Sequence, residues 1–344
     1  MRYTMLLWPH ANARYQIQSL KLAEAELRLI LARIAPDARV LPGALDMPSL
    51  DIECAAPAQP RAIDALCRHS LMYGLFERRD DGLLAPVAGR SGVRLGEDLP
   101  AVLKYKGKTN EMFLQLLINA ALYSGDYWRE EEDRLAFLDP MCGRATALFV
   151  AANRGWDAVG ADVDRGDLKE AEKYFKRYLE FHRVKHALTR ASHTLKGGGA
   201  APSVRFEYAP DPQDYKAGKT RALELVGLDA ARVDSAFGRD AFHIVACDLP
   251  YGVRHDAQLD RAADHRGNWL ETLLASALPA WRAALKPGGA VAVSFNAQNF
   301  RPERLRALMA DAGLTVMEGG PYEDFSHWVE QAITRDIAVG VKPR

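Results

Sequence analysis

Three aspartates follow apolar, strand-like segments at positions where they could hold a nucleoside. Asp139 closes "LAFLD", Asp162 closes "VGAD" and Asp229 follows "ALELVGL". In an open parallel sheet, ligands bind beyond the carboxyl ends of the strands, and a glycine in the first turn, here Gly143, lets the backbone approach them. A single acid in such a place is more often a helix cap. Three of them at successive strand ends favour a cofactor site.

Each of these positions suggests a role. Asp162 stands about 20 residues after the first strand-to-helix turn, where a carboxylate receives both ribose hydroxyls of a nucleoside cofactor. The next side chain, Val163, would lie on the adenine face. Asp229 would accept a hydrogen bond from the adenine amine.

The segment "CDLPYGVR" (247–254) places other groups after another apolar run, "FHIVA". An acid, a proline and an aromatic side chain stand together at the expected carboxyl end of a strand, so Asp248 and Tyr251 would share a rigid turn. The alternative is an ordinary tight turn with an exposed tyrosine. The other motifs favour chemistry, because combined context is what confirms a motif.

The composition limits the class of protein. The chain has 344 residues, 48% of them hydrophobic, and a mean hydropathy of −0.21, which is typical of a globular protein with two domains. No apolar run reaches the roughly 18 residues of a membrane span, and the N-terminus lacks the pattern of a signal peptide, so we expect a cytoplasmic protein without membrane association. The formal net charge is zero, so a nucleic-acid surface would have to be a local patch. The four cysteines form no C-x-x-C pair, which favours buried thiols over zinc or disulfides.

The order of the expected elements predicts two domains. Residues 1–90 combine strand-like and helical segments into a small α+β domain, and residues 91–104 form a linker. Residues 105–344 alternate strand and helix, which predicts an α/β, Rossmann-like, doubly wound sheet of seven strands with a C-terminal antiparallel hairpin. Residues 182–220 are longer than a normal helix-to-strand connection and are expected to be an insertion.

A basic and aromatic region covers the expected helix 167–186 and the insertion. It could be a surface where Lys173 and Arg177 hold RNA phosphates and aromatic rings stack on bases. The alternative is an amphipathic helix whose aromatic residues pack on the sheet beneath solvated lysines. His182 and His186 would share a helix face, with His193 nearby, but no carboxylate or cysteine completes a zinc ligand set, so no metal is expected. The basic residues are Lys169, Lys173, Lys176, Arg177, Arg183, Lys185, Arg190 and Lys196, and the aromatic residues are Tyr174, Phe175, Tyr178 and Phe181.

Taken together, these motifs resemble those of the class I S-adenosylmethionine-dependent methyltransferases, specifically the THUMP-associated tRNA guanine-N2 methyltransferases. "YKGKTNEMFLQLLINAAL" resembles the stretch before their cofactor strand, "DPMCGRAT" their D-P-x-C-G-S-G-T loop, and "GADVD" their G-x-D-I-D motif. "CDLPYGVR" resembles D-P-P-Y-G-V-R or D-L-P-F-G, and "HWVEQAITRDIAVGV" resembles their closing hairpin. The resemblance covers residues 105–344 apart from the insertion.

The resemblance implies S-adenosylmethionine as cofactor and RNA, specifically tRNA, as substrate. The implied cofactor-binding residues are Thr109, Asp139, Met141, Cys142, Gly143, Asp162, Val163, Asp229 and Asp248. The implied substrate-binding residues are Tyr251, Gly252 and Arg254, together with Lys173 and Arg177.

The "DLPYG" segment then acquires a catalytic interpretation. An exocyclic base amine is a poor nucleophile because its lone pair is delocalised into the ring. The Asp248 carboxylate and the Leu249 carbonyl would accept its two N–H groups and turn the lone pair towards the methyl donor, while Asp248 stabilises the charge that develops on nitrogen. Pro250 would stiffen the turn, Gly252 would permit its tight exit, and Tyr251 would stack on the extruded base for roughly 1–3 kcal/mol.

Two features depart from the family pattern. Arg144 and Ala145 replace a Ser-Gly pair, which adds a large cation and a Cβ beside a cationic ligand, so we expect an effect on cofactor affinity. The first 90 residues are too few to hold both the small N-terminal unit and the RNA-binding THUMP module of the full family members, so an additional RNA-binding subunit or a homo-oligomer is a candidate source of that module. The alternatives are an adenine-N6 methyltransferase on DNA or RNA, and a non-catalytic RNA- or partner-binding module on a decayed methyltransferase fold.

Overall fold

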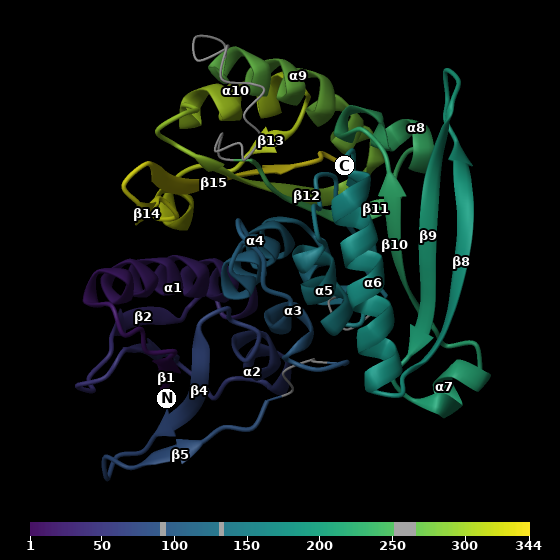
Figure 1. The fold of residues 1–344 in the computed structure, drawn as a ribbon. Coiled ribbons are helices and arrows are strands. Elements are labelled where there is room, and N and C mark those ends of the chain that lie inside the picture. The colour runs from purple at the N-terminus through teal and green to yellow at the C-terminus, as the bar shows by residue number, and fades with distance from the viewer. Residues whose placement is uncertain (90–93, 131–133, 251–265) are drawn as a thin grey trace. The chain divides into compact units, whose positions relative to one another are not determined.

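The computed structural model describes residues 1–89, 94–130, 134–250 and 266–344 (Figure 1). By internal contacts the chain divides into two compact units. The first contains Met1–Gly92 together with Glu318–Ile337, and the second contains Val93–Met317 together with Ala338–Arg344.

The first unit is built on a five-stranded antiparallel sheet in the order β2-β3-β1-β4-β5. Asn12 begins the long helix α1, because its side chain accepts hydrogen bonds from the backbone N–H groups of the first turn. Pro60 stands at the start of α2, as the sequence predicts. The elements are β1 (Arg2–Leu7), α1 (Ala13–Ile34), β2 (Arg39–Pro42), β3 (Ser49–Glu53), α2 (Pro60–Leu66), β4 (Met72–Arg78) and β5 (Leu84–Pro86).

A segment near the C-terminus packs on α1 within the same unit. The Tyr15 hydroxyl donates to the Val329 carbonyl, and the Arg14 guanidinium lies 4.3 Å from the centre of the Trp328 ring. Residues more than 300 positions apart in sequence therefore stabilise one unit. The segment comprises η4 (Gly320–Glu323), β14 (His327–Glu330) and the first part of β15 (Ile333–Val341).

The second unit alternates strand and helix. Its first half contains α3 (Leu99–Val102), α4 (Glu111–Ser124), η1 (Tyr127–Glu130), β6 (Ala136–Asp139), α5 (Thr146–Asn153), β7 (Asp157–Asp162), α6 (Arg165–Phe181), β8 (Lys185–Thr194), β9 (Ala200–Ala209) and α7 (Pro212–Lys216). Its second half contains β10 (Arg221–Gly227), η2 (Ala230–Arg232), α8 (Val233–Phe237), β11 (Phe242–Asp248), α9 (Arg266–Ala284), β12 (Leu285–Asn296), α10 (Pro302–Asp311) and β13 (Thr315–Val316).

The large sheet has the order β13-β15-β12-β11-β6-β7-β10-β9-β8, with β14 paired to β15. The strands from β12 to β10 are parallel to their neighbours. From β6 the chain proceeds to β7 and β10 on one side and returns to β11 and β12 on the other. The topological switch point therefore lies between β6 and β11, where Rossmann-like sheets bind ligands.

The sheet has ten strands rather than the expected seven. The difference arises mainly from residues 182–220, which form the antiparallel hairpin β8–β9 and the short helix α7. Strand β9 pairs antiparallel with β10, so the hairpin extends the sheet at its edge. The expected C-terminal hairpin is present as β14 and β15.

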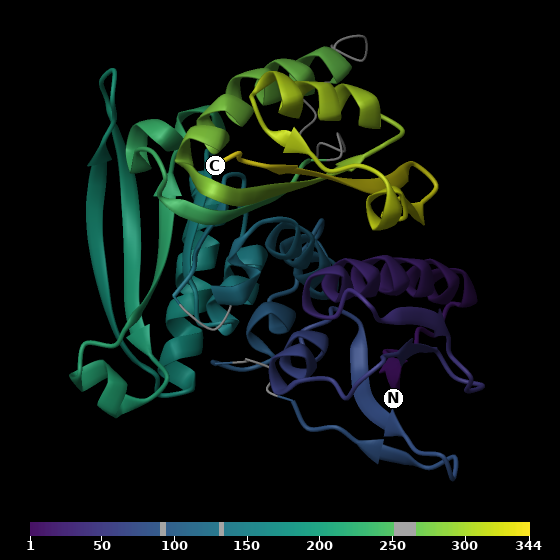
Figure 2. The same cartoon turned by 180° about the vertical axis from the view of Figure 1, so that it is seen from behind.

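Helices cover both faces of this sheet. Figures 1 and 2 show α4, α5 and α6 on one face, and α8, α9 and α10 on the other. The core includes large side chains with no more than 1% exposure, among them Phe137, Trp156, Phe175, Trp281 and Phe295. Burial of this apolar surface stabilises the sheet whose strand ends carry the candidate site.

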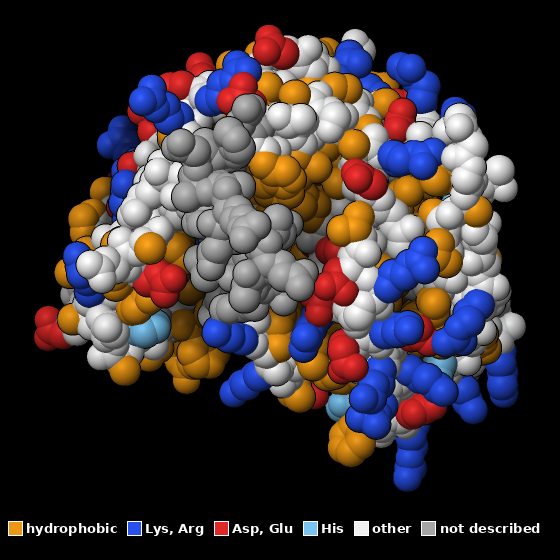
Figure 3. Space-filling view, turned by 45° about the horizontal axis from the view of Figure 1, so that its top comes forward, with side chains coloured by type: hydrophobic (Ala, Val, Ile, Leu, Met, Phe, Trp, Pro, Cys, Tyr) orange, Lys and Arg blue, Asp and Glu red, His pale blue; other side chains and the backbone are white. Residues whose placement is uncertain are grey.

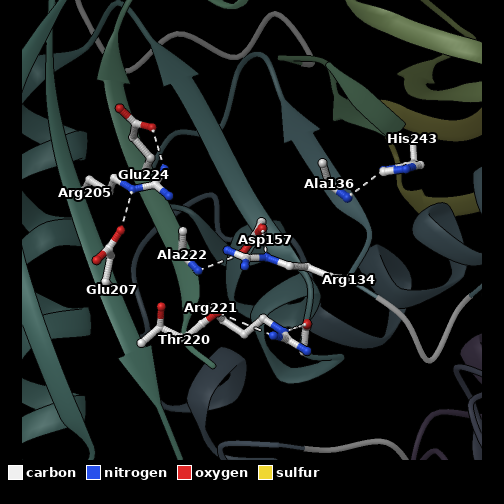
Figure 4. Close-up of polar contacts among 11 residues, drawn as sticks. Arg134, Ala136, Asp157, Arg205, Glu207, Thr220, Arg221, Ala222, Glu224 and His243 are labelled. Atoms are coloured by element: carbon white, nitrogen blue, oxygen red, sulfur yellow. Dashed lines mark hydrogen bonds and ion pairs between the residues drawn. The ribbon is translucent and has the colours of Figure 1, made fainter. Parts of the chain in front are cut away.

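Polar groups tie the amino-terminal ends of the parallel strands together (Figure 4). Asp157 accepts hydrogen bonds from Arg134 and from the backbone N–H of Ala222. The backbone N–H of Ala136 donates to Nδ1 of His243, and burial and Lys286 lower the pKa of His243 to about 4. The imidazole is thus a neutral acceptor at this edge, which is opposite to the edge where the strand-end aspartates lie.

No helix among the described residues is both long and apolar enough to span a bilayer.

Candidate active site

Three strand-end aspartates converge at the switch point. Asp139 ends β6, Asp162 ends β7 and Asp248 ends β11, and these strands are neighbours of one another through β6. Burial raises the pKa of Asp139, and the Asp162 and Asp248 carboxylates raise it further. The sequence-based expectation that acids gather at this edge therefore agrees with the observed topology. Figure 3 shows a hollow with hydrophobic walls and acidic side chains beside it.

Hydrogen bonds hold the turn around Gly143 against the end of β7. The backbone N–H of Gly143 donates to Oδ2 of Asp162 at 2.7 Å, and the N–H of Asp164 donates to Oδ1 of the same carboxylate at 2.8 Å. The N–H of Cys142 donates to the Ala161 carbonyl at 3.0 Å. Asp162 therefore fixes the loop while its remaining lone pairs stay available to a ligand.

The turn requires unusual backbone angles. Gly143 has φ of 48°, and Ala145 has φ of 68° in the left-handed region. Glycine tolerates this region without a penalty, whereas an alanine costs roughly 1–2 kcal/mol there. Ala145 thus adopts a backbone conformation that is more usual for glycine.

Burial controls the protonation of the acids. Asp139 is only 5% exposed, and desolvation raises its pKa to about 8 although the N–H of Met141 donates to it at 3.1 Å. Burial also raises the pKa of Asp162, opposed by the N–H groups of Asp164 and Gly143. Asp139 is therefore largely neutral at pH 7.

The two buried thiols at this edge are not nucleophiles. Burial raises the pKa of Cys142 and Cys247 well above the ordinary value, and the neighbouring carboxylates raise it further. The thiols remain protonated and fill space between β6, β7 and β11. The prediction of buried free thiols is therefore confirmed for Cys142 and Cys247, whereas Cys54 and Cys67 are free but only partly buried.

The Arg144 side chain pairs with an acid of α6. Its Nε donates to Oδ1 of Asp167 in α6 at 2.8 Å, and its guanidinium lies 4.7 Å from the centre of the Tyr105 ring. The Tyr105 hydroxyl in turn lies 3.2 Å from Oγ1 of Thr146. The added cation is thus neutralised by Asp167, a partner that the sequence analysis missed, since only the fold brings residues 23 positions apart together.

Asp248 and its successor are held in a fixed turn. The Thr109 hydroxyl donates to Oδ2 of Asp248 at 2.5 Å. Leu249 is 1% exposed, and its N–H donates to the Ser294 carbonyl at 2.9 Å. Pro250 is exposed. The predicted substrate-binding residues Tyr251, Gly252 and Arg254 lie outside the described residues.

The two residues that are expected to contact adenine, Val163 and Asp229, differ in their surroundings. Val163 is 71% exposed immediately after Asp162. Oδ1 of Asp229 accepts the N–H of Ala231 at 2.8 Å, so this carboxylate caps η2, the alternative considered for a lone strand-end acid. Met141 is partly buried at the turn.

The aromatic side chains of α6 mainly pack inward. Phe175 and Tyr178 are buried, and the Tyr174 hydroxyl donates to the Leu99 carbonyl. Lys173 and Arg177 are exposed on the other face. The alternative of an amphipathic helix therefore holds for these three rings, whereas Phe181 is 83% exposed.

The prediction that His182 and His186 share a helix face is wrong. Helix α6 ends at Phe181, Arg183 has a left-handed φ of 55°, and His186 and His193 lie in β8. His193 pairs with Glu224 of β10 at 2.8 Å. Within the described ranges, no group of three potential metal ligands is found.

No family model matches this sequence, and no curated protein matches it. Several solved structures are similar at low identity. TrmN from Thermus thermophilus is 15% identical, with 99% of each chain covered and a TM-score of 0.43. A TehB-like SAM-dependent methyltransferase from Corynebacterium glutamicum is 15% identical over 65% of this chain and 86% of its own, with a TM-score of 0.36.

A variant of the 16S rRNA (adenine(1408)-N(1))-methyltransferase from Catenulisporales acidiphilia is 17% identical over 64% of this chain and 91% of its own, with a TM-score of 0.36. Similarities this distant carry no argument about activity. The chemistry of the site has to come from the residues of this chain.

Proposed function

We propose that this protein transfers a methyl group from S-adenosylmethionine to an exocyclic nitrogen of an RNA base, namely N2 of guanine in tRNA. The observation that supports this proposal is the convergence of Asp139, Asp162 and Asp248 around the Gly143 turn at the switch point. A doubly wound sheet binds nucleoside cofactors at this place. Because Asp139 is largely neutral at pH 7, the carboxylates of Asp162 and Asp248 are the groups that suit a donor with a positive charge.

The residues present fit this donor. Among the described residues, a Cβ built at Gly143 would meet only Oδ2 of Asp167, at 3.9 Å, which leaves room for a ligand beside this turn. The Asp162 carboxylate uses one lone pair of each oxygen for backbone N–H groups, which leaves capacity for two ribose hydroxyls. The exposed Val163 offers an apolar surface to a purine ring. The Arg144 cation is paired with Asp167, so the departure from the family pattern is compatible with a cationic ligand.

When bound, S-adenosylmethionine supplies an electrophilic methyl group on sulfur. The chain's contribution would be to orient the base amine and to stabilise the charge that develops on its nitrogen. The Thr109 hydroxyl donates to one oxygen of Asp248 and so helps to orient the carboxylate. This carboxylate would accept one amine N–H, and the Leu249 carbonyl would accept the second. Holding the two reactants in line contributes roughly 7–11 kcal/mol of barrier lowering in well-oriented reactions.

Guanine N2 is preferred to adenine N6 because of the motif itself. Adenine-N6 enzymes usually carry N-P-P-Y or D-P-P-Y. This chain has Leu249 in place of the first proline of that motif, and "GVR" follows the tyrosine. Burial of the Leu249 side chain holds the main chain of this turn in place, and so does the hydrogen bond from the Leu249 N–H to the Ser294 carbonyl.

The experiment is a comparison of modified nucleosides in tRNA and rRNA from cells with and without the gene, by mass spectrometry. The proposal predicts loss of N2-methylguanosine in the deletion strain. Loss of N6-methyladenine would instead support the adenine alternative. Calorimetry of the purified protein with S-adenosylmethionine addresses the third alternative, since a decayed fold would bind no donor at millimolar concentration.

A further inference from the structure

Helix α6 carries a continuous row of exposed basic side chains that ends in an exposed aromatic ring. Arg165, Lys169, Lys173 and Arg177 follow one another at intervals of four residues, and Phe181 is next in the row. All five are exposed. Residues four apart form a ridge on a helix surface, and a rise of 1.5 Å per residue separates them by about 6 Å along the axis. We call these five residues the α6 ridge.

The charge of the α6 ridge is largely uncompensated. Glu172 pairs with Arg190 of β8 and Asp167 pairs with Arg144, so these two acids are directed to other elements. Glu170 lies at 4.0 Å from Lys173, a weak contact. In the described part of the chain, no carboxylate lies within ion-pair distance of Arg165, Lys169 or Arg177. Since the chain as a whole is neutral, this row is a local concentration of positive charge. Figure 3 shows many Lys and Arg side chains on one side of the molecule, with Asp and Glu side chains among them.

Phe181 has no role in the core. It is 83% exposed, more than any other large hydrophobic side chain among the described residues. Its one ring contact is T-shaped with His182, at 5.1 Å between centroids. Of the other aromatic rings of the helix, Phe175 and Tyr178 are buried and Tyr174 is partly buried. An exposed ring beside a row of cations matches the combination that binds unpaired nucleotides, in which cations contact phosphates and a ring stacks on a base.

We propose that the α6 ridge binds an unpaired segment of the substrate RNA, with its basic side chains on successive phosphates and Phe181 stacked on a base. The inference rests on the proposed function for the identity of the partner. It adds a path for the RNA, because Arg165 follows directly on Asp164, whose N–H donates to Asp162. The ridge thus begins beside the candidate active site and continues for the length of α6.

The first test measures the salt dependence of RNA binding by fluorescence anisotropy. A short single-stranded RNA and a duplex of equal length are titrated with the wild type and with the double variant Lys169→Gln, Arg177→Gln. Loss of two phosphate contacts should reduce the slope of log K against log salt by about 1.4 for the single strand. The matched control, Arg239→Gln with Arg301→Gln, removes two exposed cations elsewhere on the same unit and should leave the slope unchanged.

The second test concerns the aromatic ring. Phe181→Ala should weaken single-strand binding about 5- to 160-fold, since stacking on one base is worth roughly 1–3 kcal/mol, and Phe181→Trp should retain it. The variants are expected to fold normally, because the side chain is almost fully exposed. Unchanged affinity in Phe181→Ala, or a duplex bound as tightly and with the same losses, would overturn the proposal. Equal binding of polyglutamate would instead indicate an acidic protein partner and would also overturn it.

These results are separable from the proposed function. A protein that binds RNA through the α6 ridge but transfers no methyl group would contradict the proposed function and leave this inference standing. A protein that methylates RNA while both ridge variants bind like the wild type would contradict this inference alone.

Discussion

Replacement of Asp139 by asparagine should stabilise the protein in a strongly pH-dependent way. The pKa of this buried acid is about 8, against 3.8 for an ordinary aspartate. Because the pKa of Asp139 is higher in the folded state than in the unfolded state, the proton on this acid stabilises the folded state. This contribution is fully present below pH 3.8 and is lost as the pH rises through about 8. Asparagine remains neutral throughout and can still accept the N–H of Met141, so the variant avoids this loss.

The magnitude follows from the pKa difference. At pH 7 the difference is 7 − 3.8 = 3.2 units, which corresponds to about 4 kcal/mol at most at 1.36 kcal/mol per unit. Above pH 8 the difference is 8 − 3.8 = 4.2 units, or about 6 kcal/mol at most. The variant should therefore be more stable than the wild type at neutral pH, and the gap should widen up to about pH 8.

Urea unfolding across the pH range around this pKa measures the effect. The control is Asp211→Asn, which makes the same chemical change at an exposed cap that accepts the N–H of Gln213, and it should show no comparable pH dependence. If the unfolding free energies of the wild type and Asp139→Asn ran parallel over this range, the argument that burial keeps Asp139 protonated would be refuted.

Three further predictions concern the same site. Gly160→Ala would place a Cβ 2.7 Å from the Cys142 sulfur and should lower the free energy of unfolding in urea by about 1–3 kcal/mol. The control Gly227→Ala, where the nearest atom to the added Cβ lies at 3.3 Å, should lower it less, and equal losses would contradict the tight packing of the turn on β7. Binding of cationic S-adenosylmethionine should favour the ionised form of Asp139, so affinity should rise as the pH approaches about 8 and calorimetry in buffers of different ionisation enthalpy should detect proton release. Binding of neutral S-adenosylhomocysteine should release fewer protons, and equal proton release for the two ligands would argue against a charge effect. Asp248→Asn should still bind the donor while kcat falls about 10²–10³-fold, the usual loss when one electrostatic stabiliser is removed. An unchanged kcat would remove Asp248 from the mechanism.

The edge of the sheet that carries the candidate site could be predicted from the sequence, because the patterns that mark this edge are local. An apolar run followed by an acid marks both Asp139 and Asp248, and in a parallel sheet such residues reach the same edge whatever the details of packing. The position of Asp162 after the glycine turn is a matter of spacing along one strand–helix–strand unit. These placements depend on short-range patterns that single-sequence reasoning can detect.

The hairpin β8–β9 could not be predicted in this way. Helix α6 ends with Arg183 in the left-handed region, where a glycine would have given a visible stop signal. Strand β8 is an edge strand and is largely exposed, so it shows no apolar alternation. The pairing of Arg144 with Asp167 was equally hidden, because it depends on the packing of α6 beside the turn rather than on spacing.

The central claim is tested most directly by following the methyl group. Purified protein is incubated with methyl-labelled S-adenosylmethionine and tRNA from the deletion strain, and the RNA is digested to nucleosides. The account predicts label in N2-methylguanosine with the wild type and almost none with Asp248→Asn. No labelled base despite donor binding, or label that appears equally with both proteins, would contradict it.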